Sequence, residues 1–220
     1  MWILGITGGI GAGKSTLSKS LQEMGIPVHS ADQEIHNLID HDLAIQEKIR
    51  SFCPQAFVEG KIDRSILGEW ATSSENGLSR LEKILFPHLA KRQKKFLQYS
   101  QNKKDPIVAL DIPLLFEVGL DKYCHFVILA STPHDVRKKR VLERSGMTPQ
   151  KLKVFESHQL KEEDKRKKSD VIIDCSGDKG NALRKLKETV KCLMQKESPK
   201  WDGKWPTNLQ RKLHGSRNRP

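Results

Sequence analysis

The chain has 220 residues, of which 36% are hydrophobic and 30% charged, and it carries a formal net charge of +12. This composition is typical of a globular protein with one core and excludes a largely disordered chain. No apolar run approaches the roughly 20 residues that a membrane-spanning helix needs, and the N-terminus lacks the pattern of a secretory signal. We therefore expect a cytoplasmic protein that does not bind membranes.

The excess of basic residues indicates an anionic partner, which could be a charged substrate, a nucleic acid or a lipid surface. The cysteines are widely separated and predict reduced thiols rather than a zinc site: Cys53, Cys124, Cys175 and Cys192. The histidines also lack metal-ligand spacing, including His29, His36, His88 and His158.

The first thirty residues predict a βαβ unit. The apolar run ILGIT (3–7) ends at glycines, as a buried parallel strand does. Leu17, Leu21 and Met24 then have helical spacing, and IPVH (26–29) begins a second strand. A parallel sheet with a right-handed crossover follows from this order.

The rest of the chain extends this α/β pattern. Helical spacing of leucine and isoleucine predicts helices within 32–52, 64–72 and 76–101, and apolar runs predict strands at 106–112, 125–131 and 170–174. Basic helices are expected between 133 and 168, and a further helix follows the last strand. LKEEDKRKK (160–168) predicts mainly an exposed helix surface.

A glycine-rich stretch, GITGGIGAGKST (5–16), matches the P-loop pattern G-x-x-x-x-G-K-[ST]. Glycines let several backbone N–H groups approach phosphate oxygens, and the following helix presents its N-terminus to the same anion. The pattern follows a strand and opens a helix, so it predicts a nucleotide site. In this pattern Lys14 bridges the β- and γ-phosphates, the Ser15 hydroxyl binds Mg²⁺, and Thr16 reaches the α-phosphate.

Other motifs separate the classes of P-loop protein. NKKD (102–105) and DCSG (174–177) resemble GTPase motifs, but NKKD precedes a strand and the order of the two is reversed. A motor ATPase should be longer and should have Asp-Glu at the end of an apolar strand. Asp111 ends such a strand without an adjacent Glu, and could hold Mg²⁺ through water or orient a substrate. A small-molecule kinase is the class that remains.

Asp32 follows the second predicted strand in the segment SADQEIH. Loops after neighbouring parallel strands share one crevice, so this carboxylate could accept a proton from a hydroxyl beside the γ-phosphate. It could equally cap the next helix.

The chain resembles the dephospho-CoA kinase family from about residue 3 to 194. The segments that carry the resemblance, in order, are ITGGIGAGKST, GIPVHSAD, GKIDRSIL, DIPLLFE, the RxxxR of Arg140 and Arg144, and KRKKSDVIID. The resemblance implies a P-loop NTPase three-layer sandwich with a mostly parallel five-stranded sheet. It implies a kinase domain at 1–195, with a core (1–30, 105–132 and 169–195), a helical CoA-binding insertion (32–104) and a lid (133–168).

The resemblance also implies an activity, namely ATP- and Mg²⁺-dependent phosphorylation of the ribose 3′-hydroxyl of dephospho-CoA. It implies Asp32 as general base, Lys14 and Arg140 on the transferring phosphoryl group, and Ser15 and Asp111 at the metal. The nucleotide would be bound by Gly11, Ala12, Gly13, Lys14, Ser15, Thr16 and Arg144, and the pantetheine arm of the acceptor would lie near Leu114, Leu115 and Phe116. Arg144 would lie one helical turn beyond Arg140, on the same face. A monomer or weak homo-oligomer is expected, with no nucleic-acid partner.

Three positions depart from the family pattern, namely Ser30, Ser145 and Cys175. Ser30 replaces an acid that could help bind Mg²⁺ or substrate. Cys175 replaces an asparagine of the family pattern, so the sequence does not determine which residues contact the adenine there. Alternatives are a kinase of another nucleoside or sugar hydroxyl, or a nucleotide-dependent protein that binds nucleic acid.

From about residue 196 the chain loses periodicity, so 196–220 is expected to be an extended basic tail that is either disordered or folded back on the body. Trp201 and Trp205 lie in it and could instead stack on bases or meet a membrane surface. We expect its removal to have little effect on kinase activity.

Overall fold

Five parallel strands form the central sheet of the computed structural model, which describes residues 1–207, 209 and 211. The order across the sheet is β2-β5-β1-β6-β7. The bounds are Trp2–Thr7 (β1), Val28–Ser30 (β2), Ile107–Asp111 (β5), Phe126–Ser131 (β6) and Val171–Asp174 (β7). All five strands predicted from the sequence are confirmed, although β2 begins two residues later than expected.

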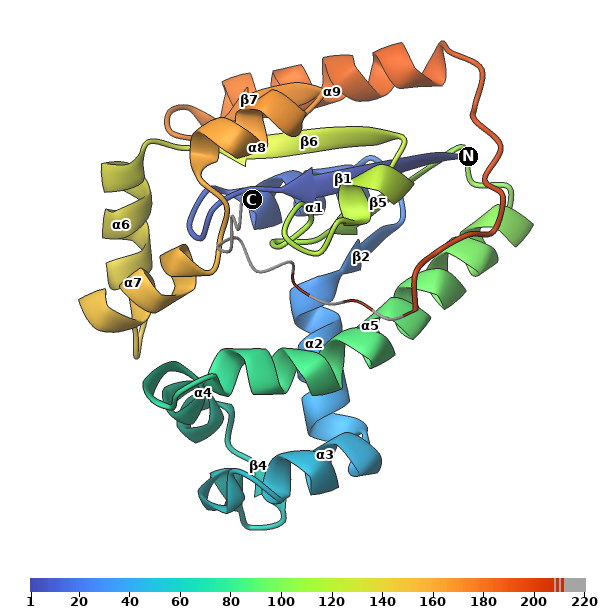
Figure 1. Ribbon diagram of the computed structural model, residues 1–220. Helices are drawn as coiled ribbons and strands as arrows, with labels where there is room; N and C mark the ends of the chain where they lie inside the picture. Colours follow the sequence, from blue (N-terminus) through green and yellow to red (C-terminus); the bar gives the residue numbers. More distant parts are fainter. Residues whose placement is uncertain (208, 210, 212–220) are drawn as a thin grey trace, which may run out of the picture.

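Helices cover both faces of this sheet, which explains why its strands are apolar on both sides (Figure 1). Leu4 and Ile6 of β1 pack with α1 (Lys14–Glu23) and α9 (Lys179–Met194) on one face. Ile3 points into a second core on the opposite face, where the main helix is α5 (Gly77–Asn102). The architecture is therefore a three-layer α/β sandwich.

The segment between β2 and β5 is a helical insertion beside the sheet (Figure 1). Its helices are α2 (Ala31–His41), α3 (Leu43–Arg50), α4 (Arg64–Ser73) and α5. Asp63 caps α4, because its carboxylate accepts hydrogen bonds from Ser65 N and Ile66 N at 2.8 and 3.1 Å. A small hairpin of β3 (Phe57–Val58) and β4 (Lys61–Ile62) follows a 3₁₀ turn at Pro54–Ala56, and was not predicted.

Three helices lie between 133 and 168, where basic helices were expected. The last of them breaks one expectation about exposure. Their bounds are His134–Leu142 (α6), Pro149–Ser157 (α7) and Glu162–Lys168 (α8), and a 3₁₀ turn at Leu120–Tyr123 precedes β6. The prediction that LKEEDKRKK is mainly exposed is wrong at Lys165, which is 1% exposed. Lys165 Nζ lies 3.0 Å from Oε1 of Glu117, an equally buried carboxylate in the loop after β5. A lysine can be buried here because its charge is paired.

Beyond α9 the chain is extended and lies along α5 (Figure 1). Contacts follow one another in order: Gln101 Nε2 donates to Trp201 O at 3.1 Å, Trp205 contacts Gln93, and Arg211 pairs with Glu82. Trp201, Trp205 and Leu209 are buried in the second core. For residues 196–207, 209 and 211 the expected disorder is therefore wrong and folding back is correct; the rest of the predicted tail lies outside the described residues.

The longest helices of the described chain are amphipathic, and none combines the length and apolarity that crossing a membrane would require.

Candidate functional site

The P-loop joins β1 to α1 at the carboxyl edge of the sheet. Gly13 is the N-cap of α1 with φ of 98°, a left-handed conformation that favours glycine, and no side chain caps the helix. A Cβ at Gly13 would come within 2.8 Å of Cys175 Cβ. Thr132 fixes the loop from the opposite side, since its hydroxyl donates to Ala12 O at 3.1 Å. The loop thus keeps an uncapped helix N-terminus, which fits a bound phosphate chain.

Lys14 is at the centre of a group of charges. Burial lowers the pKa of its ammonium, the carboxylates of Asp111 and Asp32 raise it, and the cations of Lys165 and Arg144 lower it further. Its Nζ donates to Gly8 O at 3.2 Å, across the mouth of the loop. The charges of Asp32, Asp111 and Arg144 therefore all act on the P-loop lysine.

Asp32 lies in the first turn of α2, immediately after β2. It does not cap that helix: Ser30 is the N-cap, and its hydroxyl accepts a 3.4 Å hydrogen bond from Gln33 N. Capping by Asp32 was one of the two functions left open from the sequence, and it is wrong. The serine that departs from the family pattern has this capping role, and the exposed Asp32 carboxylate is available for chemistry.

Asp111 ends β5 and is buried, and one of its oxygens accepts a 2.8 Å hydrogen bond from Ser18 Oγ. Burial raises the pKa of Asp111, whereas Lys14 and the Ser18 hydroxyl lower it. In the part of the chain that the structure describes, no three His, Cys, Asp or Glu side chains converge as a metal site. The exposed Ser15 hydroxyl and the second Asp111 oxygen fit a cation that is held largely by phosphates and water, as Mg²⁺ usually is in kinases.

The two arginines of the RxxxR motif have different surroundings. Arg140 donates to Cys175 O and Ser176 O at 3.0 and 3.3 Å, and so binds the loop after β7. Arg144 is exposed and lies beyond the end of α6 at Leu142, so the expectation that it lies on the same helical face as Arg140 is wrong. Glu143 is the C-cap of α6, and the chain turns directly after it, with Arg144 N donating to Val141 O at 3.1 Å.

Two side chains that sequence reasoning missed also contact the P-loop. Arg137 Nη1 donates to Ile10 O at 3.3 Å and also pairs with Glu156. Gln159 Oε1 accepts from Ile10 N at 3.2 Å. Arg137 lies in the basic run that predicted the lid, so its position one turn before Arg140 was the available signal. Gln159 had no such signal, because it is one polar residue in a loop.

An apolar cavity opens beside Asp32, between α2, α5 and the loop after β5. Its lining includes Asp32, Ile35, Phe86, Gln93 and Leu114. Of the three residues expected near the acceptor's arm, Leu114 lines this cavity, whereas Leu115 and Phe116 are buried in the second core.

The two GTPase-like motifs do not form a guanine site. Asn102 ends α5 and NKKD turns into β5, whereas Asp174 ends β7 and its carboxylate accepts a hydrogen bond from Ser176 N at 2.8 Å. Each therefore closes a local turn, as their positions in the sequence indicated.

Comparisons with known proteins agree with this geometry. A family model described as dephospho-CoA kinase matches residues 2–180. The dephospho-CoA kinase of Bradyrhizobium diazoefficiens is 37% identical over 176 residues, which are 80% of this chain and 87% of the relative. That of Agrobacterium fabrum is 32% identical over 196 residues, 89% of this chain and 98% of the relative.

Solved structures give the same result. A protein from Thermus thermophilus superposes with a TM-score of 0.72 at 31% identity, over 87% of this chain and 96% of its own. A dephospho-CoA kinase from Campylobacter jejuni has a TM-score of 0.65 at 25% identity, over 88% of this chain and 97% of its own. The chain therefore belongs to the dephospho-CoA kinase family, and its function is the phosphorylation of dephospho-CoA in coenzyme A biosynthesis.

Proposed function

We propose that Asp32 is the general base of this kinase, and that it takes the proton of the ribose 3′-hydroxyl as the oxygen attacks the γ-phosphorus of ATP. The bond from that phosphorus to the β–γ bridging oxygen breaks, and ADP and CoA leave. The single observation that carries the assignment is the placement of the Asp32 carboxylate, which lines the apolar cavity and also acts on the charge of Lys14. One carboxylate therefore faces both the proposed acceptor and the proposed phosphate site.

The P-loop and Lys14 would bind the nucleotide. The uncapped N-terminus of α1 offers backbone N–H groups, and the ammonium of Lys14 stabilises the negative charge that develops on the transferring group. Bound Mg²⁺ would neutralise charge on the β- and γ-phosphates. Ser15 would hold it directly, and Asp111 would hold it through water.

Arg140 would supply a further cation from the lid. Its guanidinium bonds two backbone carbonyls, those of Cys175 and Ser176, and Cys175 itself packs against Gly13 of the P-loop. Exchange of two carbonyl partners for phosphate oxygens would strengthen the electrostatic interaction, because phosphate carries a full negative charge. This supports a movement of Arg140 onto the phosphoryl group when nucleotide and acceptor are both bound.

Substitution Asp32→Asn tests the base. We expect turnover to fall by about 10²-fold or more, because the amide cannot accept the proton, with nucleotide affinity nearly unchanged. Steady-state CoA formation, measured by mass, and calorimetric titration with a non-hydrolysable ATP analogue would measure the two effects.

Glu34→Gln is the matched control, because Glu34 is an acid two residues along α2 that pairs with Arg92 at 3.4 Å. Its turnover should stay near that of the wild type. If Asp32→Asn turned over as fast as this control, Asp32 would lose the role of base.

A further inference from the structure

The cavity beside Asp32 is apolar apart from two side chains. Among the described residues that line it, Asp32 and Gln93 are the polar ones, and the others include Ile35, Phe86 and Leu114. Gln93 lies on the inner face of α5 and is completely buried. A buried amide in an apolar wall needs partners for its oxygen and for its two N–H groups.

The C-terminal segment supplies one of these partners. Trp205 Nε1 donates to Gln93 Oε1 at 3.3 Å, and Trp205 is itself only 4% exposed. An indole N–H can only donate, so it fixes the amide with its oxygen toward the tryptophan. Gln93 Nε2 then has no hydrogen-bond partner among the described residues. A buried unpaired donor is destabilising, and a hydrogen bond to a bound ligand can offset this cost.

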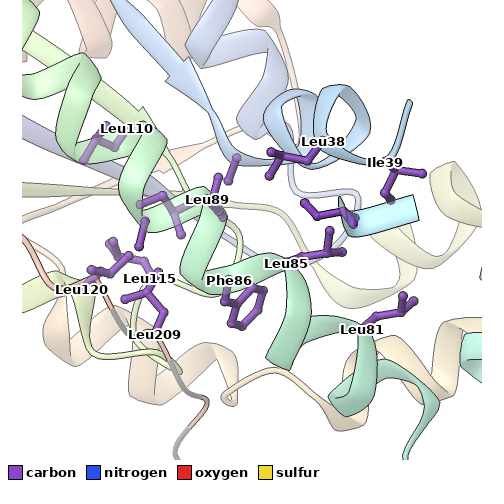
Figure 2. Close-up of a cluster of buried hydrophobic side chains, with 14 of the residues drawn as sticks. Leu38, Ile39, Leu81, Leu85, Phe86, Leu89, Leu110, Leu115, Leu120 and Leu209 are labelled. Carbon is purple, nitrogen blue, oxygen red and sulfur yellow. The ribbon is translucent and has the colours of Figure 1, made fainter. Parts of the chain in front are cut away.

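The same segment also builds the wall of the cavity. Leu209 lines it and is 4% exposed, and Figure 2 shows its side chain beside Leu115, Leu120 and Phe86 in the second core. The family model ends at residue 180, so this part of the wall lies beyond the segment that the model matches. The C-terminal segment therefore adds both a side chain and an orienting hydrogen bond to the cavity.

We propose that Gln93 is a specificity-determining residue whose Nε2–H donates to an amide carbonyl of the acceptor's pantetheine arm, and that Trp205 is the positioning residue that turns the Gln93 amide toward the cavity. This inference rests on the proposed function, because it takes the cavity beside Asp32 as the acceptor site. The arm of dephospho-CoA is mainly aliphatic and carries two amide groups, so an apolar cavity with one free donor matches its chemistry.

Two pairs of variants test this proposal. Gln93→Leu removes the donor, and Gln98→Leu is its control on the exposed face of α5. Trp205→Phe removes the orienting N–H, and Trp201→Phe is its control, because Trp201 is equally buried but donates to Lys204 O within the tail. With the P-loop saturated by a non-hydrolysable ATP analogue, calorimetry would measure the Kd of dephospho-CoA. It would also measure the Kd of AMP, which shares the adenosine 5′-phosphate but lacks the arm.

We expect Gln93→Leu to raise the Kd and KM of dephospho-CoA about 3- to 10-fold, with AMP binding, kcat and the KM of ATP unchanged. Trp205→Phe should have a smaller effect of the same kind, and both controls should behave as the wild type. The proposal would be overturned if Gln93→Leu weakened the binding of AMP as much as that of dephospho-CoA. It would also be overturned if this variant bound dephospho-CoA as tightly as the controls do. If Asp32→Asn is impaired while Gln93→Leu binds normally, this inference fails and the proposed function stands; if Asp32→Asn is active, the proposed function fails first.

Discussion

His29 of β2 is half-buried, but its two ring nitrogens are buried and have no hydrogen-bond partner among the described residues. Its ring packs against Phe96, with 5.4 Å between the ring centroids. Burial lowers the pKa of His29 to about 4, because the charged form cannot be solvated there. The sequence offered no signal for this, since a histidine beside a strand end is usually exposed.

This imidazole makes the stability of the fold depend on pH. The unfolded chain binds the proton near pH 6.5 and the folded chain only near pH 4, so the free energy of unfolding falls as the pH drops between these values. We expect His29 to contribute about 2–3 kcal/mol of this fall between pH 7 and pH 4. His29→Phe should keep the ring packing and remove that part, as measured by denaturant unfolding at several pH values. His36→Phe, at an exposed position of α2, is the control, and equal pH dependence in both variants would contradict the assignment.

At the residue scale, the positions of the proposed catalytic residues were more predictable than their surroundings. Lys14 and Asp32 follow parallel strands and Asp111 ends one, and the carboxyl ends of these strands meet the same edge of the sheet. Ser30 shows the limit of such reasoning. Its capping of α2 depends on the residue at which the helix begins, and that boundary is not encoded in hydrophobic spacing.

At the scale of elements, a buried ion pair joins α8 to the loop after β5. Lys165 Nζ and Glu117 Oε1 are 3.0 Å apart, and the same Glu117 oxygen accepts a 2.7 Å hydrogen bond from Leu160 N. The second oxygen of Glu117, Oε2, has no hydrogen-bond partner among the described residues. The pair therefore links α8 to the loop after β5, near Lys14.

Breaking this pair from one side should destabilise the fold strongly. We expect Lys165→Met to lower the free energy of unfolding by about 3–5 kcal/mol, because it leaves a carboxylate buried without its partner. Adding Glu117→Gln should recover most of the loss. Chemical denaturation of the single and double variants measures the coupling between the two side chains.

The control for this cycle is Lys167→Met, a lysine on the exposed side of the same helix. It should change the free energy of unfolding by less than about 0.5 kcal/mol. If the single Lys165 variant were as stable as this control, the ion pair would not hold α8 in place.

Elements were predictable where they are long or buried on both faces. The strands of the sheet are continuous apolar runs, and the helices of the insertion have clear helical spacing. The hairpin of β3 and β4 escaped prediction because strands of two residues carry no periodicity. Burial of Lys165 escaped it because the basic run around it is typical of a solvated helix, and its partner is far away in the sequence.

At the scale of the whole molecule, the C-terminal segment, which begins at residue 196, crosses from one face of the sheet to the other and contacts the N-terminus on the way. It leaves α9 on one face and reaches α5 on the other (Figure 1). On the way, the N-terminal ammonium of Met1 donates to Pro199 O at 2.7 Å. Trp201, Trp205 and Leu209 recur every four residues, a spacing visible in the sequence, but Gly203 and Pro206 between them indicated a loose tail.

Burial of these three side chains revises the expected effect of truncation. A chain that ends at residue 195 would leave their part of the second core uncovered, so its stability should fall although the kinase core is complete. Each such side chain contributes about 1.5–3 kcal/mol when buried, offset in part by the entropy of ordering the segment. A net loss of about 2 kcal/mol would lower the Tm of a chain of this size by about 4–8 °C.

Differential scanning calorimetry of the truncated chain and of the full chain with Trp201→Ala, Trp205→Ala and Leu209→Ala separates two causes of that loss. If apolar burial is the cause, both proteins should melt at similarly lowered temperatures, and both should bind dephospho-CoA more weakly while nucleotide affinity stays the same. If the truncated chain has the same Tm as the wild type, the segment covers the core without stabilising it. A lowered Tm in the truncated chain alone would instead assign the stability to the polar contacts of the segment, such as that between Arg211 and Glu82.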